Sequence, residues 1–306
     1  MSFTLDVKGE IAQIELEGSA LKAQLAALIQ LTANLTIHEK QLQLSIQTES
    51  AAAAKKLFKL IKSLYNPEIT LSAIKKSNLK KNNIYQIKVT TMAKEILNDL
   101  GLWTDKGLMP YPNKKIISKV LDKRAYLAGA FLAAGSVNSP LKSNYHLEIV
   151  TQSDELAQFV MSVMHHFDLP AKVIMRRNQH VVYLKASDKI SDFLRIVSAN
   201  QAVLDFEDIR IQRDFHNSLT RLDNCEVANE MKILHAGQVQ VDAILELKKQ
   251  NRIGSLDYKY TSVIELRLEN PEASLNELCD LYYQKTGSVI SKSGMKHRLM
   301  KILALV

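Results

Sequence analysis

The sequence predicts an α+β fold, with two pseudo-symmetric αββαββα halves followed by an all-α domain. Two observations predict the halves. A nine-residue apolar segment recurs at an offset of 102 residues (127 minus 25), and the same order of helix and strand patterns follows each copy. A third observation predicts the last domain, because from about residue 218 onward the apolar residues recur only at helical spacing.

The repeated segment is expected to form a central helix in each half. It reads LAALIQLTA at residues 25–33 and LAGAFLAAG at residues 127–135. Its small side chains would allow two such helices to approach closely along a pseudo-two-fold axis, although ordinary core packing accounts for the same residues. Because the match continues through the rest of each half, we interpret it as a duplication rather than as chance.

Strands and a capped helix are expected after each copy. The alternation of a half-buried strand occurs at residues 44–48 and 147–151. Ser50 and Ser153 are the expected N-caps of the next helices, which should end near a proline. The expected hairpins pair residues 69–74 with 84–89 and residues 172–175 with 181–184, and the closing helices cover residues 92–102 and 190–197.

Turn-forming and polar segments predict the domain boundaries. PYPN at residues 110–113 is typical of a linker between the halves. A polar stretch near Ser218 precedes a long helical pattern that extends from about residue 223 to residue 250. We therefore expect domains at residues 1–108, 109–217 and 218–306, with the long helix joining the repeated body to the tail.

The tail carries the start and stop signals of a helix-turn-helix. Ser274 followed by Glu277 has the spacing of a capping box, and Gly287 ends the same helix at a turn. A third helix begins at Ser291 and has no acidic residue before Leu303. A basic helix is commonly no more than a solvated face, but this one occupies the position of a recognition helix.

We expect this third helix to contact double-stranded DNA. Ser293 and Lys296 are the expected readers of base edges, and phosphate contacts are expected from Lys292, Arg298 and Lys301. The full candidate set is Ser291, Lys292, Ser293, Lys296, His297, Arg298 and Lys301. Basic residues on the matching hairpins of the two halves are candidate secondary DNA contacts, with solvated turns as the alternative: Lys75, Lys76, Lys80, Lys81, Arg176 and Arg177.

The repeated nonapeptide resembles the signature of the LAGLIDADG homing endonucleases, whose halves have the same αββαββα order. In that family the acidic residue at the eighth position of each central helix helps to hold a divalent metal at the scissile phosphate. Here the eighth positions are Thr32 and Ala134, and the sixth positions, Gln30 and Leu132, are not acidic either. The resemblance therefore implies a LAGLIDADG-like body without its catalytic carboxylates. We expect no catalytic residue, no metal, no cofactor and no enzymatic activity.

Segments along nearly the whole chain resemble the WhiA family of sporulation and cell-division regulators. These segments are LKKNNIY (79–85), KRAYLAGAF (123–131), GSVN (135–138), RLDNCEVAN (221–229) and LRLENP (266–271). The resemblance implies a bacterial transcription regulator that binds promoters of cell division, chromosome segregation or sporulation, through a C-terminal helix-turn-helix. Another transcription or cell-division protein is a further candidate partner.

Composition is consistent with these expectations and adds little specificity. The 306 residues carry 40 basic and 32 acidic side chains, a charge of +8 that favours a polyanionic partner only modestly. Cys225 and Cys279 lack the spacing of a zinc site. The N-terminus lacks a signal-peptide core, and the apolar run at residues 125–137 is too short to span a bilayer. We expect a cytoplasmic, nucleoid-associated protein without membrane contact.

Two other functions stay open on the sequence. The body has lost its acids without visible replacement chemistry, so it would also suit a sensor or protein-interaction scaffold in which DNA binding is secondary. The other alternative is an active site-specific endonuclease, which needs the carboxylates that Thr32 and Ala134 replace.

Overall fold

The computed structural model of the chain describes residues 2–38, 41–75, 83–142 and 144–306. It divides into two compact units, Met1–Arg213 and Asp214–Val306, which we call the body and the tail. Within the described residues, we find no helix whose length and apolar character would let it span a bilayer.

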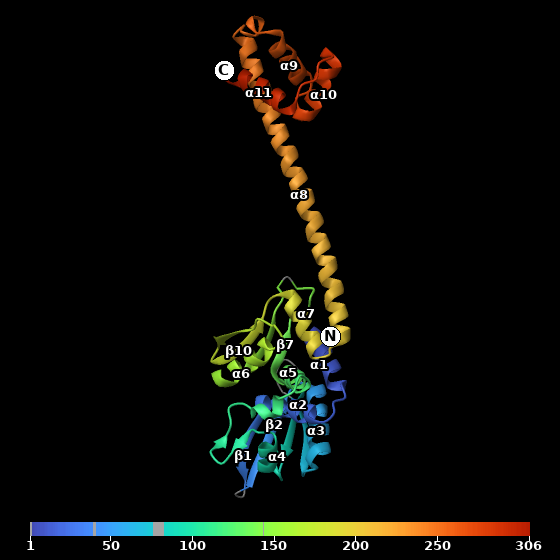
Figure 1. Ribbon diagram of the computed structural model, residues 1–306, viewed down its shortest axis with the longest axis vertical. Helices are drawn as coiled ribbons and strands as arrows, with labels where there is room; N and C mark the ends of the chain where they lie inside the picture. Colours follow the sequence, from blue (N-terminus) through green and yellow to red (C-terminus); the bar gives the residue numbers. More distant parts are fainter. Residues whose placement is uncertain (1, 39–40, 76–82, 143) are drawn as a thin grey trace. The chain divides into compact units, whose positions relative to one another are not determined.

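The first half of the body packs helices against an antiparallel sheet (Figure 1). The strands lie in the order β1-β2-β4-β3. The elements of this half are α1 (Phe3–Gln13), α2 (Ser19–Thr32), β1 (Ala33–His38), β2 (Gln41–Thr48), α3 (Ala51–Tyr65), β3 (Ile69–Lys75), β4 (Asn83–Val89) and α4 (Ala93–Asp99). A short hairpin of β5 (Trp103–Thr104) and β6 (Gly107–Leu108) and the 3-10 helix η1 (Lys114–Ile117) connect it to the second half.

The second half repeats this arrangement. Its sheet has the order β7-β8-β10-β9, again antiparallel, so each strand has a counterpart at the same place in the first sheet. The elements are α5 (Val120–Ala134), β7 (Gly135–Val137), β8 (Leu147–Thr151), α6 (Asp154–His165), β9 (Lys172–Arg176), β10 (Gln179–Leu184) and α7 (Ser187–Ile196). The matching strand orders confirm the predicted repeat of two αββαββα halves.

Local signals in the sequence correctly mark two helix starts, and the expected hairpin of the second half is present. Ser50 Oγ accepts a hydrogen bond from the Ala53 amide at the start of α3, and Ser153 Oγ accepts one from the Leu156 amide at the start of α6, both at 3.2 Å. Arg177 and Asn178 join β9 to β10 with φ angles of 52° and 59°. Positive φ at both central residues is the geometry of a tight hairpin turn whose twist suits the strands it joins.

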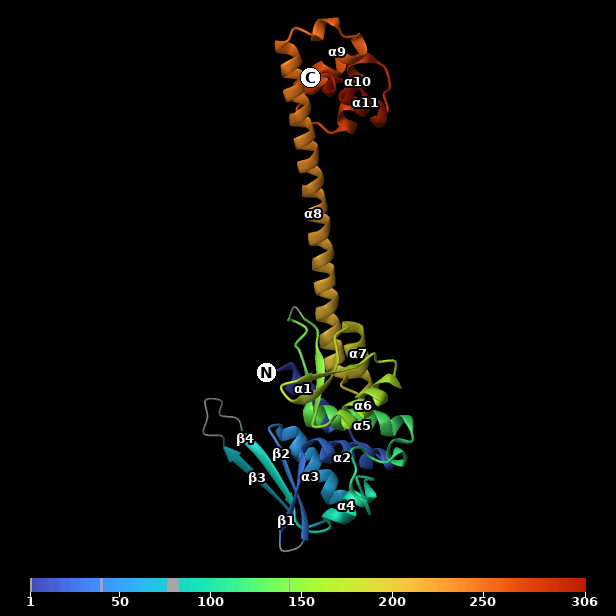
Figure 2. The same ribbon diagram turned by 90° about the vertical axis from the view of Figure 1, so that its left-hand side faces the viewer.

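The two central helices, α2 and α5, lie side by side where the halves meet (Figure 2). Gly129 makes this approach possible. A Cβ atom at that position would lie 2.5 Å from the Gln24 carbonyl oxygen and 3.0 Å from the Ala27 Cβ. The predicted close packing of the repeated helices is thus confirmed, and it depends on small residues because any larger side chain would force the backbones apart.

Helix α1 precedes the repeated elements, although no helix was expected before residue 19. Its buried face consists of Val7, Lys8 and Ile11 and includes only two apolar residues, so the apolar face is too narrow to recognise by pattern. The Thr4 hydroxyl donates a hydrogen bond to the Val137 carbonyl (2.8 Å) and accepts one from the Val137 amide (3.0 Å). These bonds fix the N-terminal helix to the edge strand β7 of the second half.

The tail consists of helices. They are the C-terminal part of α8 (Asn200–Lys249), the 3-10 helix η2 (Ile253–Ser255), α9 (Tyr258–Glu269), α10 (Leu275–Thr286) and α11 (Lys292–Leu303). The predicted start of the long helix near residue 223 is wrong, because α8 already begins at Asn200. The polar stretch near Ser218 is compatible with an exposed helix, and neither Gly nor Pro occurs between Asn200 and Ala236 to end it.

Candidate nucleic-acid interface

Helices α10 and α11 form a capped pair joined by a short turn. The Ser274 hydroxyl accepts a hydrogen bond from the Glu277 amide (3.2 Å), and the Glu277 carboxylate accepts one from the Ser274 amide (2.7 Å), which confirms the predicted capping box. These bonds hold the pKa of Glu277 below its usual value. Gly287 ends α10 with φ 67°, and the Ser291 hydroxyl accepts from the Gly294 amide (3.1 Å) to begin α11.

One face of α11 is fixed in the core of the tail. Met295, Leu299 and Ile302 are almost fully buried at helical spacing. They belong to an apolar cluster with residues of α8, α9 and α10, namely Ile244, Leu247, Val263, Ile264, Leu266, Leu278 and Tyr282. Because this face is fixed, the opposite face of α11 has one defined set of side chains that point to solvent.

The outward face of α11 carries most of the predicted DNA-binding residues. Exposed side chains there are Lys292, Ser293, Lys296, His297 and Lys301. Within the part of the chain that the structure describes, Lys292, Lys296 and Lys301 form neither an ion pair nor a hydrogen bond through their side chains. The Ser291 and Ser293 hydroxyls lie 3.0 Å apart, so Ser293 is adjacent to the helix cap. The structure thus gathers three uncompensated cations and a hydroxyl on one helix face.

Arg298 departs from the expected role of a phosphate contact. Its guanidinium Nη1 donates to the Lys259 carbonyl (3.2 Å) and to the Tyr282 hydroxyl (2.9 Å), and the guanidinium lies 5.1 Å from the centre of the Tyr282 ring. The hydrogen bond from Arg298 outweighs the opposing effect of burial, so the pKa of Tyr282 is lowered. Arg298 is therefore a half-buried brace between α9, α10 and α11, which its place in a basic run did not reveal.

A second arginine fixes the connection between α9 and α10. Arg267 is buried, and its Nη1 donates to three carbonyl oxygens, those of Asn270, Pro271 and Ala273, at 3.2, 3.3 and 2.7 Å. Burial lowers the pKa of its guanidinium. Gly237 of α8 meets the same loop, since a Cβ there would lie 2.3 Å from the Pro271 carbonyl oxygen. These contacts hold the end of α8 and the helix pair as one unit.

Two exposed apolar residues, which no sequence pattern predicted, accompany the basic residues of α11. Val289 lies in the turn before α11 and is 87% exposed, and Met300 lies on the outer face of α11 and is 55% exposed. A valine exposed to this degree in a turn is a weak signal in a sequence, because turn residues carry no periodicity that predicts their burial.

The secondary candidates on the body hairpins differ among themselves. Arg176 is paired, since its Nη2 lies 3.0 Å from Glu148 Oε2, while Arg177 and Lys75 are exposed at the ends of their strands. Burial opposes ionisation of Glu148, but hydrogen bonds from His146 and Arg176 outweigh it and lower the pKa of that carboxyl. Lys76, Lys80 and Lys81 lie outside the described residues.

The positions of the nuclease acids lie at the C-terminal ends of α2 and α5. The Thr32 hydroxyl donates to the Leu28 carbonyl of its own helix (2.5 Å), and Ala134 offers no ligand atom. Among the described residues, no group of three or more His, Cys, Asp or Glu side chains is arranged to hold a metal ion. Of the nearby acids, Asp122 accepts from the Ser19 hydroxyl (2.7 Å) and from the Lys119 amide (3.1 Å) at the opposite end of α5.

Comparison with known protein families identifies the chain along its length. Three family models match in succession, namely the WhiA N-terminal LAGLIDADG-like domain (residues 19–103), the WhiA LAGLIDADG-like domain (123–216) and the WhiA C-terminal HTH domain (219–306). The chain belongs to the WhiA family. Its fold class is therefore the one predicted, with two LAGLIDADG-like halves and a helix-turn-helix tail.

Curated WhiA proteins are similar to the chain over its full length. Proteins named "Probable cell division protein WhiA" from Staphylococcus epidermidis and Lysinibacillus sphaericus are each 43% identical over 99% of this chain and 95% of their own. Among solved structures, one described as "full-length DUF199/WhiA from Thermatoga maritima" matches with a TM-score of 0.58 and 21% identity, covering 100% of this chain and 98% of that one. At this identity the WhiA structure supports the fold alone.

Proposed function

We propose that the protein is a sequence-specific DNA-binding transcription regulator whose tail inserts α11 into the major groove of duplex DNA. The observation that supports this most is the outward face of α11, where Lys292, Lys296 and Lys301 have no counter-charge within the described residues. A helix that is fixed on one face and uncompensated on the other is the arrangement by which helix-turn-helix proteins present a recognition helix.

The outer face of α11 suggests a division of roles. Ser293 and Lys296 lie toward the start of the helix, where the side chains of a recognition helix meet base edges, and Lys292 and Lys301 suit phosphate oxygens. In the sequence, His297 follows Lys296 and precedes Lys301. The exposed Val289 and Met300 add apolar surface of the kind that contacts a thymine methyl group. Arg298 acts through the position of α11 rather than on DNA.

We infer that the body carries out no nuclease reaction. Thr32 and Ala134 supply no carboxylate at the ends of the central helices, and Glu148 and Asp122 are engaged by neighbouring side chains and amides. Hydrolysis of a phosphodiester with metal help needs ligands that fix the cation and its activated water. The body then serves to position the regulator or to contact a further transcription or cell-division protein.

The names of the relatives place their activity in cell division. For this chain we propose regulation of promoters for cell division or chromosome segregation, with the protein located on the nucleoid in the cytoplasm. A scaffold in which DNA binding is secondary is the competing proposal. It is favoured by the Arg176–Glu148 pair, which takes one hairpin cation away from DNA.

Selection from a randomised duplex library tests the proposal on the full chain. We expect enriched duplexes to share a motif, and we expect Lys296→Met to weaken binding to the selected duplex by about 1–3 kcal/mol and to relax the preference at one or two positions. Lys248→Met, which removes an exposed lysine from the last turn of α8, is the matched control and should bind normally. Absence of any enriched motif, together with full binding by Lys296→Met, would favour the scaffold instead.

A further inference from the structure

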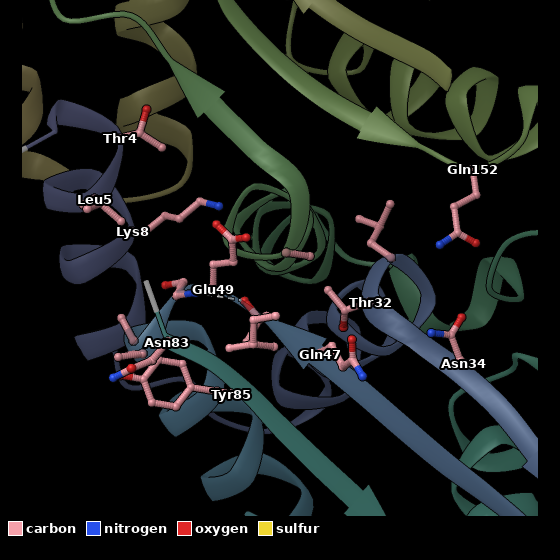
Figure 3. A pocket seen from close by; sticks show the side chains of 17 residues that line it. Thr4, Leu5, Lys8, Thr32, Asn34, Gln47, Glu49, Asn83, Tyr85 and Gln152 are labelled. Carbon is pink, nitrogen blue, oxygen red and sulfur yellow. Dashed lines mark hydrogen bonds between the residues drawn. The ribbon is translucent and has the colours of Figure 1, made fainter. Parts of the chain in front are cut away.

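A cavity in the body of about 990 Å³ lies beside the end of α2, between α1, the first sheet and the end of α5 (Figure 3). Its volume is at the upper end of the range of small-molecule sites. The described residues that line it include Thr32 and Ala133 at the ends of the two central helices, Lys8 of α1, and Gln152 of the second half. The cavity therefore brings together parts of both halves.

Lys8 is the unusual group in this cavity. It is only 9% exposed, and its side chain extends from α1 into the cavity (Figure 3). Within the described residues its ammonium has no hydrogen-bond or ion-pair partner, and it lies 6.0 Å from the centre of the Phe131 ring. Burial lowers the pKa of this ammonium to about 8, and no neighbouring charge contributes to the shift.

Among the described residues, none of the lining side chains forms an ion pair with Lys8. Glu49 is the acidic residue among the described lining residues, and it has a partner of its own. Amide side chains are contributed by Asn34, Gln47, Asn83 and Gln152, and Tyr85 contributes a hydroxyl. None of these five side chains has a hydrogen-bond partner within the described part of the chain, so the wall offers donors and acceptors around one buried positive charge.

Burying a charge without a partner is unfavourable, and proteins tolerate it mainly where the charge has a function. A lysine that only filled space in this position would be more stable as a methionine of similar length. We propose that this cavity binds a small polar metabolite through an anionic oxygen group, a phosphate or a carboxylate, which pairs with the Lys8 ammonium. The exposed amide side chains would then hydrogen-bond the remainder of the ligand, which suits a hydroxylated molecule.

The location of the cavity suggests how a bound ligand would affect the body, because residues of both halves lie at or next to it. Thr4, one turn before Lys8, is bonded to the Val137 backbone of the second half, while Thr32 and Gln47 belong to the first half. A ligand held between Lys8 and the first sheet would stabilise the packing of the two halves by mass action. This inference does not depend on the proposed DNA-binding function, and its test contains a binding measurement without DNA.

The experiment measures binding to the full chain by calorimetry at matched ionic strength, with ribose 5-phosphate, inorganic phosphate and succinate as probes. Ribose 5-phosphate and inorganic phosphate test a phosphate group, and succinate tests a carboxylate. We expect at least one probe to bind with a dissociation constant that rises tenfold or more in Lys8→Met, and binding to recover in part in Lys8→Arg. Lys94→Met, an exposed lysine of α4 away from the cavity, is the control and should bind like the unchanged protein.

The thermal unfolding midpoint of the ligand-free proteins is a second measurement. Because Lys8 is a buried charge without a partner in the described ranges, Lys8→Met should unfold at a higher temperature than the unchanged protein. The same variant should lose the rise in unfolding midpoint that the probe produces. The proposal is overturned if no probe binds, if binding survives Lys8→Met, or if Lys8→Met lowers the unfolding midpoint. It is also overturned if Lys8→Met weakens binding to duplex DNA while no small anion binds, since the ammonium would then contact a DNA phosphate.

Discussion

Basic side chains occur in both the body and the tail, but their surroundings differ. On the body hairpin, Arg176 is held by Glu148, a mostly buried carboxylate that also accepts from His146. On α11 of the tail, Lys296 and Lys301 form no ion pair within the described part of the chain, and no acid occurs between Ser291 and Leu303. The number of basic residues in a region is therefore a poor guide to whether that region forms a DNA interface. An unpaired cation is available to a phosphate, whereas a paired one must first give up its partner.

The largest expected effect concerns DNA binding and separates the two regions directly. Lys296→Ala with Lys301→Ala should weaken binding to a selected duplex by about 2–4 kcal/mol, roughly 30- to 1000-fold, because it removes one base contact and one phosphate contact. The magnitude of the salt slope of the logarithm of the binding constant should fall by about one, because one phosphate contact is lost.

The body counterpart of this change is Arg176→Ala with Arg177→Ala. We expect it to change affinity by less than about threefold, since Arg176 is already paired and only Arg177 is available. Fluorescence anisotropy at several salt concentrations measures both double variants. Equal losses in the two regions would show that the body hairpins share the DNA contact, and the comparison above would then be wrong.

A second prediction uses a close-contact glycine in each region. Gly129→Ala places a Cβ 2.5 Å from the Gln24 carbonyl in the body, and Gly237→Ala places one 2.3 Å from the Pro271 carbonyl in the tail. Each should lower the free energy of unfolding by about 1–3 kcal/mol, because a backbone must move. The loss should occur in the unit that carries the change, as measured by hydrogen exchange.

Gly9 provides the control for these two changes. It lies within α1, and a Cβ there would meet nothing within 4 Å. Gly9→Ala should therefore stabilise the body by about 0.5–1 kcal/mol, through the loss of unfolded-state entropy. Destabilisation by Gly9→Ala as large as that of Gly129→Ala would show that the close contacts at Gly129 and Gly237 do not explain the losses.

A third prediction compares an arginine from each region. Arg298→Met should destabilise the tail by about 1–2 kcal/mol, because it removes charged hydrogen bonds to the Lys259 carbonyl and the Tyr282 hydroxyl. Arg176→Met should cost the body less than about 1 kcal/mol, since its guanidinium is half exposed and screened by solvent. Urea unfolding followed by helical circular dichroism measures both. A larger loss of unfolding free energy in Arg176→Met than in Arg298→Met would contradict this prediction.

The smallest expected effect is an acid dependence of the body. The pKa of Glu148 is lower in the folded state than in the unfolded chain, so its contribution to stability is present above the ordinary glutamate pKa of about 4.3 and is lost as the pH falls through the folded value. Arg176→Met should weaken this dependence. Unfolding midpoints between neutral and acidic pH measure the difference, and an unchanged acid profile in Arg176→Met would assign the lowered pKa to His146 instead.

Local patterns predicted much of the fold because the signals act over a few residues. Ser50, Ser153 and Ser274 each accept the amide hydrogen bond that a cap requires, at the positions where the sequence placed the helix starts. Helix α1 and the true start of α8 were missed. Helix α1 depends on contact with a strand that is distant in the sequence. The start of α8 consists largely of exposed polar residues, whose intrinsic preference for helix over loop is weak.

The sequence by itself determined the duplication, the loss of acids at Thr32 and Ala134, and the absence of acids on α11, because these are statements about residue types at fixed spacing. Only the tertiary structure decided which cations are engaged. In the structure, Arg298 bonds to Tyr282, Arg176 pairs with Glu148, and Lys8 lies in a cavity without a partner among the described residues. The physical reason is that desolvation and pairing depend on residues far apart in the chain, such as Lys8 and Phe131, which packing alone brings together.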